Sequence, residues 1–174
     1  MCAICNFKIE FGVGHPLALS VASATRAAIE RGLIDEAKTG GVLGTARQRL
    51  AAIDTLKVFQ HRLETSVAND QLLALPDFYV LMIESLTWGF FHATPEGFDP
   101  DIVPEMPDTT SDDVEQRSVV VLAADVTMHA LLTGVIELHQ ALDLGLVVID
   151  APDVPYDLLR RAIERALVPA ATSA

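Results

Sequence analysis

Two cysteines stand two residues apart at the start of the chain, in the opening sequence MCAICN. Cys2 and Cys5 are the only cysteines among 174 residues, and the first histidine, His15, follows ten residues later. A Cys-x-x-Cys turn lets both sulfurs face one centre, which is half of a tetrahedral metal site or a pair able to form a small disulfide. The pattern predicts a zinc or iron site to which Cys2, Cys5 and His15 contribute ligands.

His139 is the candidate for a fourth ligand. It lies near the end of an apolar helical pattern, on the same line as Leu132 and Val135, which is expected to face inward. A Cys2His2 set completed by His139 would be a structural site, whereas a site without it would keep a position open for water or substrate. A redox pair and a chemically inert pair of cysteines stay open as alternatives.

Cys2 also has a possible role of its own. If Met1 is removed, Cys2 becomes an N-terminal nucleophile whose own amine can act as the base. The opening Met-Cys-Ala-Ile resembles the start of class II glutamine amidotransferases over these four residues, but Ala3 stands where that family usually has glycine. The resemblance implies a four-layer sheet sandwich, in contrast to the mainly helical pattern of the rest of the chain.

A second group of chemically active residues lies in the middle of the chain. Asp125 and His129 are four residues apart, so on a helix the carboxylate can orient the imidazole, and Glu84 interrupts a strongly apolar stretch. If the three are buried together, desolvation should raise the pKa of Glu84, and the trio could act as acid and base on a small molecule. The alternative is a solvent-facing pair with Glu84 on a narrow polar stripe.

The spacing of apolar residues predicts the elements that position these groups. Four long helices, a shorter C-terminal helix and two short strands are expected. The predicted helices span 16–31, 43–68, 78–92, 117–142 and 155–167, and the predicted strands span 7–11 and 146–149. We therefore expect a mainly α-helical fold, an up-and-down bundle of about four long helices with the fifth helix and the strands appended. Cys2, Cys5, His15 and His139 would meet at one end of it.

Length and composition favour one domain over residues 1–174. An N-terminal arm over 1–14, an acidic, proline-containing connection over 96–116 and a flexible tail over 168–174 are expected to flank or interrupt its core. Just over half of the residues are apolar, which suits a buried core and a contact between copies of the chain.

Charge and the N-terminal sequence limit the possible partners. Twelve basic against 24 acidic residues leave a formal charge of −12, which disfavours nucleic acid and anionic membranes. No secretory signal is evident, so a cytoplasmic protein is expected, and the apolar stretch 118–136 is interpreted as a core helix.

The leading hypothesis is a metal-binding helical protein. The alternatives are a metal-free homodimer or higher homo-oligomer that serves in assembly, and a small-molecule enzyme that uses Glu84, Asp125 and His129 beneath a lid formed by 96–116.

Overall fold

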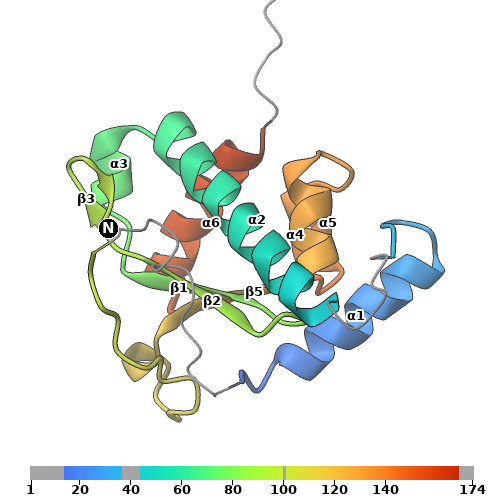
Figure 1. Ribbon diagram of the computed structural model, residues 1–174. Coiled ribbons are helices and arrows are strands. Elements are labelled where there is room, and N and C mark those ends of the chain that lie inside the picture. Colours follow the sequence, from blue (N-terminus) through green and yellow to red (C-terminus); the bar gives the residue numbers. More distant parts are fainter. Residues whose placement is uncertain (1–13, 37–43, 100, 169–174) are drawn as a thin grey trace, which may run out of the picture.

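The computed structural model describes residues 14–36, 44–99 and 101–168, which form a four-stranded sheet with helices on both faces (Figure 1). A separate two-stranded hairpin lies beside it. The elements in chain order are α1 (Ala18–Glu30), α2 (Gly44–Ser66), α3 (Asn69–Leu73), β1 (Phe78–Met82), β2 (Thr87–Phe91), β3 (Ala93–Thr94), β4 (Gly97–Phe98), the 3-10 helix η2 (Val114–Gln116), β5 (Val119–Ala123), α4 (Asp125–Leu132), α5 (Leu138–Asp143), β6 (Val147–Asp150) and α6 (Asp153–Leu167).

The main sheet has the strand order β2-β1-β5-β6 and mixed direction. β1 and β5 are parallel neighbours in its centre, while β2 and β6 pair with them in antiparallel fashion from the two sides. The register places Met82, the last residue of β1, opposite Ala123, the last residue of β5. The carboxyl ends of the two central strands therefore meet at one edge of the sheet.

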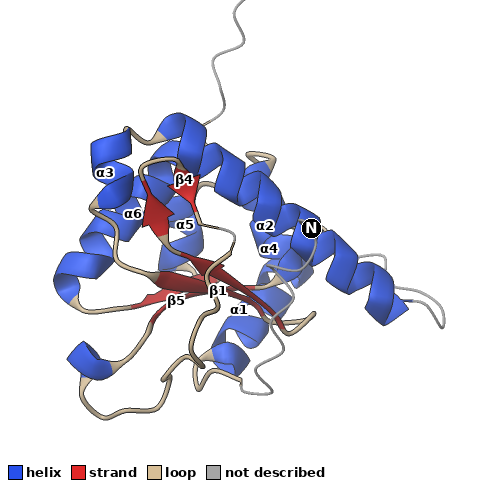
Figure 2. Cartoon of the chain, turned by 60° about the vertical axis from the view of Figure 1, so that its left-hand side comes forward, coloured by secondary structure: helices blue, strands red, loops and turns tan. Residues whose placement is uncertain are grey.

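Helices cover the sheet unequally. The helices α2, α4, α5 and α6 lie over one face, and α1 lies over the other (Figures 1 and 2). Alternate residues of β1 serve the two layers: Phe78 and Val80 join the larger core, and Tyr79 and Leu81 join the smaller one. Because both faces are covered, β1 and β5 are buried at every position and read as continuous apolar runs.

The predicted helix over 78–92 is wrong, because this stretch forms the antiparallel hairpin of β1 and β2. Its runs FYVLM and TWGFF are rich in aromatic and β-branched residues, which fit the pleated surface of a sheet. Leu86, in the connecting turn, has φ +50°, a left-handed conformation that does not occur inside a helix. β1 is a central strand of the sheet, and β2 lies at its edge.

The predicted helix over 117–142 is also wrong, since it divides into β5, α4 and α5. The β-branched run that starts at Val119 forms a central strand, and Gly134, with φ +73°, follows the end of α4. These two changes overturn the mainly α-helical, up-and-down bundle, and the chain has a mixed α/β fold. Helices and a sheet share one core instead of four helices packing around a common axis.

Other predicted elements are confirmed. Helices over 16–31, 43–68 and 155–167 match α1, α2 and α6, and the strand over 146–149 matches β6. β6 pairs with β5. The strand predicted for 7–11 lies outside the described residues, as do Cys2, Cys5 and all of the predicted tail except Val168.

The acidic segment 96–116 is mostly irregular, as predicted, but it is tied to the domain by hydrogen bonds. Tyr79 Oη donates to the carbonyl oxygen of Glu105 at 2.8 Å, and the Asp108 N–H donates to Ser118 Oγ at 3.0 Å. The stretch 118–136 forms β5 and α4, in agreement with a place in the core, though not as one helix. None of the described helices is long and apolar enough to span a membrane.

Candidate functional site

Two carboxylates meet at the carboxyl edge of the central strands. Beyond β1 the pairing continues, as the Ile83 N–H donates to the carbonyl oxygen of Ala123 at 3.0 Å, and Glu84 follows directly. Beyond β5 the chain enters α4 at Asp125. Glu84 Oε2 accepts a hydrogen bond from the backbone N–H of Asp125. Ala124, the residue at the N-cap position of α4, makes no side-chain hydrogen bond to the helix. The Glu84 side chain provides that cap in its place.

Asp125 is the more enclosed of the two acids. Ser85 Oγ donates to its Oδ1 at 3.2 Å, and Gln48 Nε2 donates to its Oδ2 at 3.4 Å. Burial, followed by the charge of Glu84 and a hydrogen bond with it, raises the pKa of Asp125 to about 7, against the smaller opposing effect of Ser85 and Gln48. Asp125 therefore holds a proton that it can release near neutral pH.

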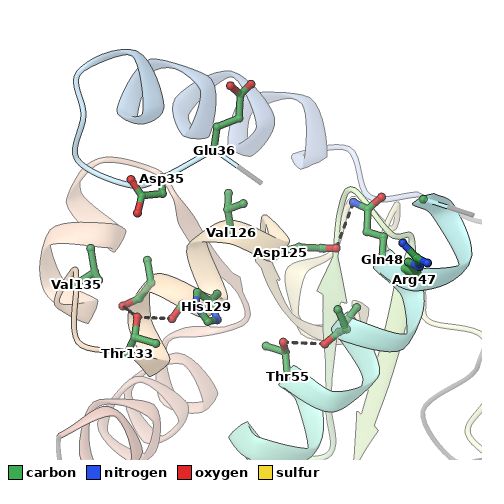
Figure 3. Close-up of a pocket in the computed structure, with 14 residues that line it drawn as sticks. Asp35, Glu36, Arg47, Gln48, Thr55, Asp125, Val126, His129, Thr133 and Val135 are labelled. Carbon is green, nitrogen blue, oxygen red and sulfur yellow. Dashed lines mark hydrogen bonds between the residues drawn. The ribbon is translucent and has the colours of Figure 1, made fainter. Parts of the chain in front are cut away.

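Asp125 opens into a pocket of about 520 Å³ between α2, α4 and the residues that follow α1. Figure 3 shows Asp125 and Gln48 pointing toward one another from α4 and α2, with Arg47 beside Gln48. The polar lining comprises Asp35, Glu36, Arg47, Gln48, Thr55, Asp125, His129 and Thr133. The rest of the lining is small or apolar, which leaves room for a ligand: Gly44, Ala51, Ala52, Val126, Ala130 and Val135.

The pocket walls are held by close packing on the sheet and between helices. α2 approaches β2 at Gly89, where an added Cβ would lie 3.3 Å from a methyl carbon of Leu56. On the other side, the buried hydroxyls of Thr25 in α1 and Thr127 in α4 are 3.5 Å apart. These contacts hold α2, which carries Gln48, against β2, and α4, which carries Asp125, against α1.

Asp125 connects the acid–base residues expected from the sequence: it shares the pocket lining with His129, and it contacts Glu84, which is not part of that lining. Asp125 and His129 both line the pocket from consecutive turns of α4. Glu84 is exposed, as in the alternative in which it lies on a polar stripe, so the three residues are not buried together, and Asp125 is the acid whose pKa burial raises. None of the described residues of 96–116 lines this pocket, so the pocket gives no support to the expected lid.

Ser85 and Gln48 were not found by sequence reasoning. A hairpin over 78–92 would have put Ser85 in the same turn as Glu84, and its aromatic and β-branched residues were the available signal. Gln48 gave no signal, since it is one polar residue among many on α2. Its contact with Asp125 depends on how α2 crosses the sheet.

His15, a predicted metal ligand, is buried in a different cluster. Its Nε2 lies 3.2 Å from Asp150 Oδ2, and its Nδ1 accepts the Leu17 N–H at 3.2 Å, so Nε2 carries the proton and donates to Asp150. Arg117 Nη1 donates to the same carboxylate oxygen at 3.1 Å. Burial lowers the pKa of His15 despite the neighbouring Asp150. Both ring nitrogens thus have partners within the protein.

His139 does not face inward as predicted. It lies exposed on α5, and its Nδ1 is 3.1 Å from Glu137 Oε2. The argument for its position assumed one continuous helix over 117–142, which the fold overturns. Across residues 14–36, 44–99 and 101–168, no three His, Cys, Asp or Glu side chains are grouped so that they could hold a metal ion. The Cys2 and Cys5 site stays a prediction, since both residues lie outside those ranges.

Comparison with known proteins adds no further information. No protein-family model, curated protein or solved structure is significantly similar to this chain. The functional argument therefore rests on the geometry and electrostatics of the site.

Proposed function

We propose that the protein binds a small molecule in the pocket between α2 and α4 and transfers a proton to or from it through Asp125. One observation carries this proposal. An enclosed carboxyl group with a pKa of about 7 stands against a second carboxylate and opens into a pocket of about 520 Å³. Perturbed acids in clefts of this kind are candidates for acid–base catalysis.

The surrounding residues have distinct roles in this proposal. Asp125 is the group that donates or accepts the proton, and a pKa near the working pH makes both directions possible. Glu84 is a positioning residue, because its charge and a side-chain hydrogen bond with Asp125 favour the protonated acid, while it also accepts the N–H at the start of α4. His129, one turn along α4, is the second group in the pocket able to exchange a proton.

The test is a carbon-13 NMR titration of the side-chain carboxyl groups. We expect Asp125 to titrate near pH 7, and Glu84→Gln to lower that pKa because the neighbouring charge is lost. Asp54→Asn, on the exposed side of α2, is the matched control and should leave the Asp125 titration unchanged. An Asp125 that titrates below about pH 5 in the unmodified protein, as free aspartate does, would refute the proposal.

The other expectations drawn from the sequence stay predictions of their own. A cytoplasmic location and a homodimer or higher homo-oligomer are consistent with the composition. Light scattering after size-exclusion chromatography tests the oligomer.

A further inference from the structure

We propose that the ligand of this pocket is a small organic cation with N–H donors on an apolar body, and that its cationic nitrogen binds against Asp125. This inference rests on the proposed function and adds the chemical class of the ligand. It follows from the direction of the hydrogen bonds around the pocket, from the charges at its rim and from its apolar wall.

The hydroxyl groups of the pocket are set to accept hydrogen bonds. Thr55 Oγ1 donates its proton to the carbonyl oxygen of Ala51 at 2.8 Å, and Thr133 Oγ1 donates to that of His129 at 2.8 Å. Each hydroxyl has used its one proton on its own helix, so only lone pairs are left for a ligand. Gln48 uses an amide proton on Asp125. A ligand that satisfies the two threonine hydroxyls must bring N–H or O–H donors, whereas Gln48 keeps a second amide proton that it can donate.

Negative charge predominates around the pocket. Asp35 and Glu36 are exposed carboxylates in its lining, although Glu36 is paired with Arg26 at 2.8 Å. The pair of Asp125 and Glu84 adds at least one further negative charge at the part of the pocket that Asp125 lines. Among the described residues of the lining, Arg47 is the only Lys or Arg, and it is exposed on α2. This balance favours a cationic ligand over an anionic one.

The remaining wall suits a compact apolar group. Ala51 and Ala52 on α2 face the pocket, as do Val126 and Ala130 on α4 and Val135 beyond it. Their short side chains leave apolar surface that a ring or short chain can cover, while the charged end of the ligand reaches Asp125. Pockets for small ligands commonly combine such surface with a few directed polar groups.

Binding of a cation should be linked to the proton on Asp125. The protonated acid is neutral, so the ammonium group binds well only after Asp125 releases its proton to solvent, and the carboxylate that results is the form able to accept a proton from the ligand. With a pKa of about 7, Asp125 is about tenfold more ionised at pH 8 than at pH 6, so affinity should rise about tenfold over that range. Among the described residues, the charged or titratable groups around Asp125 are Glu84, which contacts it from the β1–β2 turn, and four groups that line the same pocket: Arg47 from α2, Asp35 and Glu36 after α1, and His129 from α4.

The experiment compares benzylammonium, benzyl alcohol and benzoate, which share a ring and differ in charge. Binding is followed by amide chemical-shift changes in the unmodified full chain at pH 6 and pH 8. We expect benzylammonium to bind more tightly than the alcohol, benzoate to bind least, and only benzylammonium to gain about tenfold in affinity at pH 8. The shift changes should include Gln48 and Ala130, which line the pocket.

Variants separate the sources of the pH dependence. Asp125→Asn should abolish the pH dependence, and His129→Gln should keep it, although imidazoles as a class titrate in the same range. Arg47→Gln should strengthen binding of the cation by removing a like charge. Tighter binding of benzoate, or no shift changes with benzylammonium at the highest soluble concentration, would overturn the inference. If either result is obtained and Asp125 still titrates near pH 7, only the inferred class of ligand is refuted, and the proposed function stands.

Discussion

Replacement of Asp125 by Asn should stabilise the protein at pH 8 and have little effect at pH 4. An acid whose pKa is higher in the folded state holds its proton more tightly there, so unfolding becomes easier as the pH rises from 3.8 towards 7. Asn has the same shape, stays neutral at every pH and can donate to Glu84 as the protonated acid does. It therefore removes a cost that the unmodified protein carries only when Asp125 is ionised.

The size of the effect follows from the pKa of Asp125. A rise from 3.8 to about 7, at 1.36 kcal/mol per pH unit, gives an upper limit of about 4 kcal/mol. Because Asp125 is only half-buried and opens into a pocket, we expect about 2 kcal/mol at pH 8. For a chain of this length, that is a rise in Tm of roughly 4–8 °C.

Urea unfolding of both proteins at pH 4, 5, 6, 7 and 8 measures the effect. The difference in the free energy of unfolding should be near zero at pH 4, grow steadily and level off above pH 7. Asp54→Asn, on an exposed side of α2, is the control for a general loss of negative charge. The difference in the free energy of unfolding could instead be the same at every pH, or equal the difference measured for Asp54→Asn. Either result would show that Asp125 is not the perturbed acid, and the reasoning about the site would fail.

Two further substitutions test the packing and the turn that position the site. Gly89→Ala should lower the free energy of unfolding by about 1–3 kcal/mol, since its Cβ would lie 3.1 Å from a ring carbon of Phe91 and 3.3 Å from Leu56. Gly44→Ala is the matched control, because its Cβ would have no atom of the described residues within 4 Å, and equal effects of the two substitutions would contradict the close approach of α2 to β2. Leu86→Gly should be more stable than Leu86→Ala by about 1 kcal/mol in urea unfolding, because only glycine adopts φ +50° without strain; equal stabilities would show that the turn is not strained.

Several elements could be predicted from the sequence because their signals are local. α1, α2 and α6 alternate apolar and polar residues at helical spacing, and β6 is a short apolar run after a glycine. The spacing of Asp125 and His129 correctly placed both on one helix, α4. Local spacing is enough for such features, since each depends on residues within a few turns of one another.

The segments 78–92 and 117–142 could not be assigned by the same means. Both contain strands buried on two faces, and a continuous apolar run has no period that separates such a strand from a buried helix. The β-branched and aromatic content of these runs is typical of strands, whereas the length of the two apolar segments is typical of helices. The mistaken helices then led to the bundle and to the inward position of His139.

The sequence by itself determined that the chain has amphipathic helices, a large apolar core and an acid four residues from a histidine. Only the tertiary structure decided that the acid acts with Glu84, which lies 41 positions earlier in the chain. Parallel pairing of β1 with β5 puts Met82 opposite Ala123, so the two carboxylates emerge together at the edge of the sheet. The register of a parallel pair is set by packing across the whole core, and no local pattern of residues encodes it.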